Sequence, residues 1–131
     1  MQAVTQRLKK IIEPGTTITD VGSVKLSVIE EIESNIEIVG GKYVPSHPIA
    51  GTERSGPDAG YAGLFEGRWC ILTPTKKTNK KALNSLETFW KFLGMQTKIM
   101  TPEHHDLVLA VTSHAPHLIA YTMVCLLYTS P

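Results

Sequence analysis

Strand-like runs and helical patterns alternate along this chain, and no other feature of the sequence constrains its fold as strongly. Thr17 to Val21 is a β-branched run typical of a buried strand. The apolar positions between Leu83 and Leu93 recur at helical spacing, and the helix that they predict ends at Gly94. Because strands that alternate with helices form layered structures, the sequence predicts an α/β fold with a mostly parallel sheet.

The other elements are predicted from the same kinds of pattern. Apolar residues at helical spacing predict a helix that stops at Pro14-Gly15, and a second from Val24 to Ile32 with Ser23 near its N-cap. Thr101-Pro102-Glu103 has the character of a helix start and predicts a long last helix. Further strands are expected at residues 36–39, 43–44, 68–72 and 97–100.

The segment from His47 to Gly56 has no apolar periodicity, so its residues call for an explanation other than packing. His47 titrates near neutrality and can accept a proton at cellular pH, and Pro48 restricts the backbone that presents it. Gly51 and Gly56 allow a positive φ or a close approach to a ligand. On spacing alone, an ordinary surface loop explains the segment equally well.

The order of the elements favours a functional role for two short pairs of residues. Gly22-Ser23 and Ser46-His47 each follow a predicted strand directly. In parallel α/β sheets, ligands bind beyond the carboxyl ends of the strands. We therefore expect both pairs to lie at the functional edge of the sheet.

Polar residues of the predicted last helix share one face. Pro116 lacks an N–H group, so we expect a kink beside that face. A polar stripe next to a kink suits a ligand wall, although hydrogen-bonded interior residues would give the same pattern. The residues of this face, spaced by three or four, are Asp106, Ala110, Ser113, His117 and Tyr121.

Composition excludes several classes of protein. The net charge of +1 gives no reason to expect nucleic acid or an anionic membrane as a partner, and two cysteines cannot build a disulfide framework. The start does not resemble a signal peptide, and no apolar run approaches the ~20 residues of a membrane helix. A zinc site is disfavoured because no carboxylate or thiolate is suitably spaced from the histidines. We expect a reduced, cytoplasmic protein with no metal.

Three motifs in one order carry a resemblance to a known family. They are Thr19 to Lys25, His47 to Gly56 and Ser113 to His117, and the residues Leu64 to Pro74 and His104 to Asp106 extend them. Together they resemble the prephenate/arogenate (cyclohexadienyl) dehydrogenase family, over a region from the first helix to Val124. The resemblance implies the second half of a Rossmann-type nucleotide-binding domain in residues 1–100 and the first helix of an all-α C-terminal domain in residues 101–124.

The resemblance also implies a reaction. Members of the family use NAD or NADP to decarboxylate prephenate or arogenate oxidatively in tyrosine biosynthesis, as homodimers. His47 matches the catalytic base, which implies that turnover falls as the pH drops through the histidine range. Ser23 matches the catalytic serine beside the substrate hydroxyl, where Gly22 and Ser23 contact the cofactor. The positions that match substrate-binding residues are Thr52, Ser113, His114 and His117.

The chain also departs from the family pattern. The dinucleotide fingerprint GxGxxG does not occur in the sequence. We therefore expect an internal fragment that is inactive alone, with the residue that selects NAD or NADP outside it. Residues 125–131 do not fit the family and are expected to be a non-native tail.

Two other functions stay open at this point. One is a non-catalytic substrate-binding or regulatory module derived from the family, and an upstream reading frame that encodes GxGxxG would argue against it. The other is a Rossmann oxidoreductase that acts on a β-hydroxy acid. Such enzymes rely on a lysine in the helix after the domain junction, where this chain has Ser113, His114 and His117.

Overall fold

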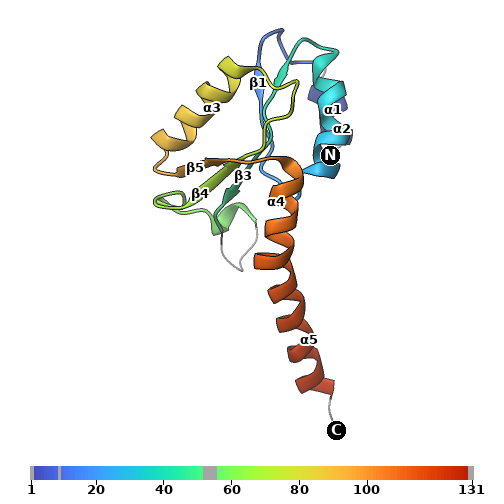
Figure 1. Cartoon of the computed structure of the whole chain (residues 1–131), viewed down its shortest axis with the longest axis vertical. Coiled ribbons are helices and arrows are strands. Elements are labelled where there is room, and N and C mark those ends of the chain that lie inside the picture. The colour runs from blue at the N-terminus through green and yellow to red at the C-terminus, as the bar shows by residue number, and fades with distance from the viewer. Residues whose placement is uncertain (1, 9, 52–55, 130–131) are drawn as a thin grey trace.

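The computed structural model describes residues 2–8, 10–51 and 56–129 of the chain. Helix α3 lies on one side of the strands and helices α1 and α2 on the other, while the last helices run away from the sheet as one long rod (Figure 1). The elements in chain order are α1 Gln2–Leu8, β1 Thr17–Ile18, α2 Leu26–Glu37, β2 Lys42–Tyr43, β3 Ser46–Ile49, the 3-10 turn η1 Pro57–Ala59, β4 Trp69–Leu72, α3 Lys80–Phe92, β5 Gln96–Ile99, α4 Pro102–Leu109, the π-helical turn η2 Ala110–His114 and α5 Ala115–Thr129.

The strands form a mixed arrangement. β1 pairs with β2 and β4 pairs with β5 in parallel, whereas β3 and β4 are antiparallel. Only Val44 and Pro45 separate β2 from β3. Val44 N donates to Ile18 O of β1 (2.9 Å), and Thr73 N, directly after β4, donates to Pro45 O (3.0 Å). The predicted α/β fold is confirmed, with β3 as the strand that departs from a parallel order.

Helix α3 packs on the sheet as its sequence pattern predicts. Its apolar face contributes Ala82, Leu86 and Trp90 to a core that also contains Leu72 of β4 and Met95. Helix α2 builds a second core from its own isoleucines and Tyr43 of β2, which belongs to a separate two-stranded sheet of β1 and β2. The three-stranded sheet β3-β4-β5, on which the site described below rests, packs on α3.

The prediction of a strand at residues 36–39 is wrong, because helix α2 extends to Glu37. Ile29, Ile32 and Ile36 are the buried residues of this helix, so the apolar spacing of three and four continues past the predicted end at Ile32. Gly41 closes the turn against the helix, where an added Cβ would lie 2.7 Å from the Ile36 side chain. Helical periodicity outweighed the β-branched composition of this segment.

Ser23 does not cap α2, contrary to the sequence-based expectation. Lys25 is the N-cap residue and has no capping hydrogen bond from its own side chain. The carboxylate of Asp106, in α4, accepts hydrogen bonds from Lys25 N (2.8 Å) and Leu26 N (3.0 Å) instead. A distant side chain therefore satisfies the backbone donors that a local serine was expected to satisfy.

The last helix contains a π-helical turn, where Ala115 N donates to Ala110 O. The turn precedes Pro116, which cannot donate a backbone hydrogen bond, so it takes up the irregularity expected there as a kink. It also adds a residue to the helical repeat, which breaks the predicted single face. His117, beyond the turn, is exposed.

Pro102–Thr129 is one helical stretch of the described chain that is long and apolar enough to cross a membrane, judged by length and composition alone. Only 6% of its most apolar window is buried. The expectation that no segment reaches this length is corrected, because the average hydropathy stays high despite the polar residues of the π turn.

Candidate functional site

A cavity of about 280 Å³ opens where the loop before α2, strand β3 and the π turn meet. It brings together four of the residues predicted from the sequence, from segments up to 91 positions apart in the chain. The lining residues are Ser23, His47, Ile49, Ala50, Gly51, Arg68, Leu109, Ser113 and His114. Gly51 has φ +137°, in the region that favours glycine, as the sequence predicted.

Two other predicted site residues are absent from the described lining of this cavity, and a third lies outside the described residues. Gly22 is not among its described lining residues, and Gly22 N donates to Asp20 Oδ2 (3.0 Å). His117 is also absent from the described lining, and Thr52 lies outside the described residues.

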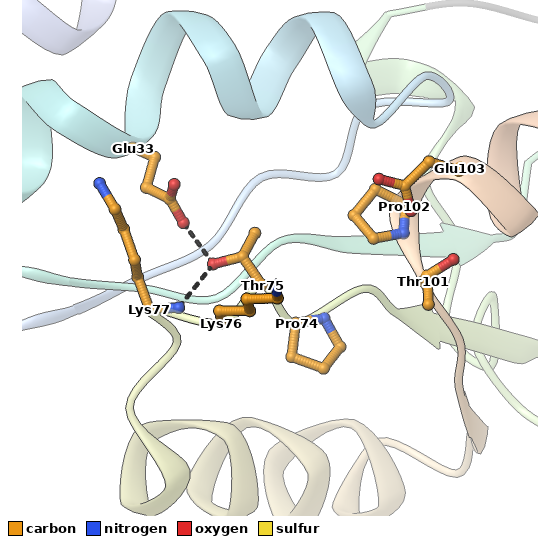
Figure 2. Close-up of a pocket in the computed structure, with 8 residues that line it drawn as sticks. All are labelled: Glu33, Pro74, Thr75, Lys76, Lys77, Thr101, Pro102 and Glu103. Carbon is orange, nitrogen blue, oxygen red and sulfur yellow. Dashed lines mark hydrogen bonds between the residues drawn. The ribbon is translucent and has the colours of Figure 1, made fainter.

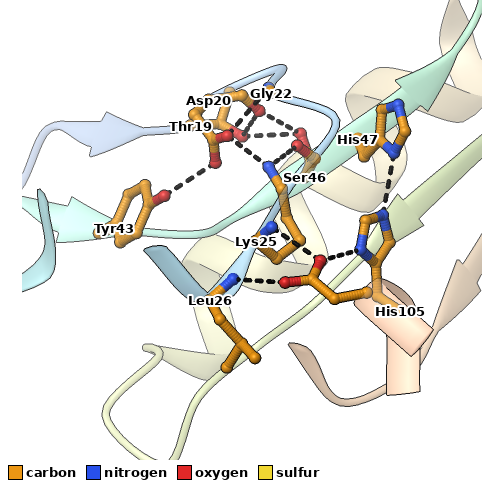
Figure 3. A network of polar contacts seen from close by, with 10 residues as sticks. Thr19, Asp20, Gly22, Lys25, Leu26, Tyr43, Ser46, His47 and His105 are labelled. Atoms are coloured by element: carbon orange, nitrogen blue, oxygen red, sulfur yellow. Dashed lines mark hydrogen bonds and ion pairs between the residues drawn. The ribbon is translucent and has the colours of Figure 1, made fainter. Parts of the chain in front are cut away.

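His47 lies within β3 rather than after a strand, which corrects its expected position. The side chain is 9% exposed, and its Nδ1 lies 2.9 Å from Nε2 of His105. His105 is fully buried, and its Nδ1 lies 2.8 Å from Oδ1 of Asp106. The two rings meet edge to face, with centroids 5.1 Å apart. Figure 3 shows the ring edge of His47 that carries Nε2 turned away from His105.

The surroundings of His47 favour the neutral imidazole. Burial, followed by the nearby His105 and Lys25, lowers the pKa of His47 to about 4, and Asp20 opposes this shift. His114 on the π turn lowers it slightly further. A neutral imidazole can accept a proton, so His47 has the protonation state of a base throughout the neutral pH range.

A buried ion pair supports the loop that carries Ser23. Lys25 is fully buried, pairs with the carboxylate of Asp20 and donates to Ser46 O (2.7 Å). Tyr43 Oη donates to Asp20 Oδ1 (2.8 Å), on the other oxygen of the same carboxylate (Figure 3). Burial lowers the pKa of Lys25 although Asp20 favours its charged form. The network ties the loop from Asp20 to Lys25 to the start of β3.

Asp106 is held as a carboxylate. Burial would raise its pKa, but hydrogen bonds from Leu26 N, His105 and Lys25 N outweigh this and lower it. Asp106 thus joins His105 to the start of α2. Sequence reasoning missed His105 and Asp106 as partners of His47, and the only signal was their place in the motif His104 to Asp106.

Arg68, directly before β4, is a residue of the cavity lining that the sequence analysis did not identify. The sequence pattern predicts a strand that begins at Arg68, but Arg68 lies before β4 and lines the cavity. Its guanidinium places a permanent positive charge beside a pocket that otherwise presents hydroxyl, imidazole and apolar groups.

A second and larger cavity, of about 420 Å³, lies between α2, the loop after β4 and the start of α4 (Figure 2). Its polar groups bond one another: Thr75 Oγ1 donates to Glu33 Oε1 and accepts from Lys77 N. Its described lining contains none of the predicted site residues. In the described part of the chain, no group of three or more His, Cys, Asp or Glu residues could hold a metal ion.

Two protein-family models match the chain. The model described as the prephenate dehydrogenase nucleotide-binding domain matches residues 1–99. The chain belongs to the prephenate dehydrogenase family. The family's dimerization-domain model matches residues 101–130, a region that includes α4 and α5 as well as most of the segment expected to be non-native.

Individual members of the prephenate dehydrogenase family are similar over almost the whole chain. Cyclohexadienyl dehydrogenase of Zymomonas mobilis is 43% identical over 126 residues, which cover 95% of this chain and 42% of the relative. The structure of prephenate dehydrogenase from A. aeolicus in complex with hydroxyphenyl propionate and NAD+ has a TM-score of 0.89 and 39% identity, over 99% of this chain and 45% of that one. Synechocystis arogenate dehydrogenase has a TM-score of 0.81 and 29% identity, over 95% of this chain and 44% of that one. The chain thus spans less than half the length of each relative.

Proposed function

We propose that this chain is the central segment of a nicotinamide-dependent dehydrogenase that oxidatively decarboxylates prephenate, arogenate or both in tyrosine biosynthesis. The observation that carries the proposal is the cavity in which His47, Ser23, Ser113 and His114 meet. The coverage of the relatives supports the view that the active protein is longer than these 131 residues.

The proposed chemistry begins at the substrate hydroxyl. His47 removes the hydroxyl proton while hydride leaves the carbon that bears it, and the ring carboxylate departs as carbon dioxide. A nicotinamide, when bound, supplies the hydride acceptor. A positioned base of this kind contributes about 10²–10⁴-fold in rate. Loss of the carboxylate makes the ring aromatic, which drives the reaction.

The other site residues take roles around His47. Ser23 lies on the same cavity and orients the hydroxyl and the nicotinamide, with Gly22 giving the cofactor close access to the backbone. The cavity fits the nicotinamide end of such a cofactor, since hydroxyl, imidazole and glycine backbone groups line it. The substrate contacts are assigned to Thr52, Ser113, His114 and His117.

The apolar surface of α5 is proposed to be covered by protein. Leu118 is 69% exposed and Tyr121 70% exposed, and both lie in the region that matches the dimerization domain. Exposed apolar area of this extent marks an interaction surface. We assign it to the rest of the helical domain and to a second subunit of a cytoplasmic homodimer, with neither membrane nor nucleic acid as a partner.

The proposal is tested with the complete protein that contains residues 1–131, recovered by sequencing outward from the gene segment. Formation of reduced nicotinamide is followed with prephenate and arogenate, each with NAD and with NADP. Turnover with at least one combination is expected. Specific substrate binding without turnover under any combination would instead support the non-catalytic module.

Arg68 is expected to help bind the carboxylates of the substrate. Replacing it by Met should raise KM about tenfold and leave kcat nearly unchanged, because a charge-assisted contact of this kind strengthens ground-state and transition-state binding alike. Steady-state kinetics of the complete protein measure both constants. Lys98→Met, on β5 and away from the described lining of the cavity, is the control and should leave KM unchanged.

The lowered pKa of His47 corrects the expectation that turnover falls as the pH drops through the ordinary histidine range. Since the pKa of His47 is lowered to about 4, the imidazole stays neutral as the pH falls from 8 to about 5. We expect protonation of His47 to cause no fall in kcat/KM between pH 8 and about 5. Below about pH 5, kcat/KM should fall as His47 becomes protonated. A decline centred near 6.5 would show that the site does not lower the pKa of the base.

A further inference from the structure

We propose that His105 and Asp106 are positioning residues that fix which nitrogen of His47 accepts the substrate proton. The structure links the three side chains in one line, with His47 Nδ1 2.9 Å from His105 Nε2 and His105 Nδ1 2.8 Å from Asp106 Oδ1. The inference deepens the proposed function, because it rests on His47 acting as the base.

For a His105 that carries a single ring proton, the direction of the hydrogen bonds follows from the Asp106 end of the line. Backbone N–H groups can only donate, so both carboxylate oxygens act as acceptors toward Lys25 N and Leu26 N. A carboxylate has no proton to offer, so the bond between His105 and Asp106 requires the proton on Nδ1 of His105. A neutral His105 then has a bare Nε2, which can only accept.

The tautomer of His47 is determined by that acceptor. Its Nδ1 must carry the proton that is donated to His105, which leaves the lone pair on Nε2. This nitrogen lies on the ring edge turned away from His105 (Figure 3), and His47 lines the cavity. The arrangement therefore presents the basic nitrogen to the site where the substrate hydroxyl is expected.

The proton transfer is balanced within this geometry. The substrate O–H bond breaks, a new N–H bond forms at Nε2 of His47, and the electron pair of the O–H bond forms the carbonyl as hydride leaves for the cofactor. His47 then carries a positive charge, with its Nδ1–H still directed at His105. His105 in turn stays bonded to the negative charge of Asp106, so the line of side chains stabilises the charge that develops.

The tautomer can be read directly by NMR in the complete protein labelled with ¹⁵N at its histidines. The ring-nitrogen chemical shifts distinguish a protonated nitrogen from a bare one. At neutral pH we expect His47 to carry its proton on Nδ1, and a proton on Nε2 would overturn the proposal. This measurement needs no variant and no catalytic activity.

Two substitutions at His105 separate positioning from a purely structural role. His105→Leu removes the acceptor, so the His47 proton is expected to move to Nε2, with kcat lowered about 10²-fold and KM little changed. His105→Gln restores an acceptor oxygen and is expected to recover the wild-type tautomer and most of kcat. His104→Leu, the exposed neighbour on α4, is the matched control and should match the wild type.

The possible results are distinct. Wild-type tautomer and kcat in His105→Leu would overturn the proposal, as would equal loss of kcat in both His105 variants. Should His105→Leu fail to fold, the wild-type spectrum and His105→Gln still decide it. If the complete protein shows no dehydrogenase activity, the proposed function fails on its own, while the spectra still determine whether His105 fixes the His47 tautomer.

Discussion

Replacing His47 by Asn is expected to lower kcat of the complete protein by about 10²–10⁴-fold while substrate still binds. Asn cannot accept a proton at neutral pH, so the variant loses the base but keeps a polar side chain of similar reach. The backbone at this residue is held by the pairing of β3 with β4 and by the hydrogen bond from Lys25 to Ser46 O. Neither contact involves the imidazole ring, so both remain in the variant. Steady-state kinetics and equilibrium substrate binding measure the two effects separately.

His104→Asn is the matched control for this experiment, because His104 is exposed on α4 and lies outside the described lining of the cavity. It should leave kcat unchanged. Near wild-type turnover in His47→Asn would remove His47 as the base and, with it, the proposed chemistry of the site.

Replacing Lys25 by Met is expected to give the largest loss of stability. The substitution leaves the Asp20 carboxylate buried without its cation, and breaking a buried pair in this way costs about 3–5 kcal/mol. The apparent Tm of the complete protein should fall by about 10 °C. Thermal unfolding followed by circular dichroism measures this change.

Two further variants show whether burial of the pair causes the effect. Lys77→Met breaks the exposed pair of Lys77 with Glu37 and should leave Tm unchanged within error. Adding Asp20→Asn to Lys25→Met removes the unpaired charge and should recover much of the lost stability. A loss in Lys25→Met no greater than in Lys77→Met would mean that the buried pair does not stabilise the fold.

The elements set by local patterns could be predicted from the sequence. Strands β4 and β5 lie within one residue of their expected positions, and helix α3 within three, since apolar spacing and terminating residues define them. The strand expected at residues 36–39 failed because isoleucines satisfy helical and strand patterns alike. The helical spacing of Ile29, Ile32 and Ile36 and the packing of Ile36 into the second core both favour the helix.

The residues of the candidate site could be predicted from the sequence better than the contacts between them. The resemblance to the family identified four residues that the fold brings to one cavity: Ser23, His47, Ser113 and His114. It did not connect His47 with His105, because 58 residues separate them and no spacing rule describes a contact between a strand and a helix so far apart. Such contacts depend on tertiary structure alone.

Lys25 shows a second reason for the difference. The sequence alone predicts that the side chain of a lysine at the start of a helix is exposed to solvent, since lysine is almost never fully buried unless it is paired. The acceptors that pair it, Asp20 and Ser46 O, come together only when β1, β3 and α2 are assembled. The π turn was missed for a similar reason, because Pro116 signals an irregularity without specifying its form.

The capping of α2 by Asp106 has a consequence for how the molecule can move. The first turns of α4 belong by sequence to the dimerization domain, yet Asp106 anchors them to the Ser23 loop and, through His105, to His47. If the two domains open and close around a substrate, α4 must therefore travel with the nucleotide-binding domain. The mechanical boundary between the domains then lies after Leu109, at the π turn, where Ser113 and His114 would move relative to a catalytic base that stays in place.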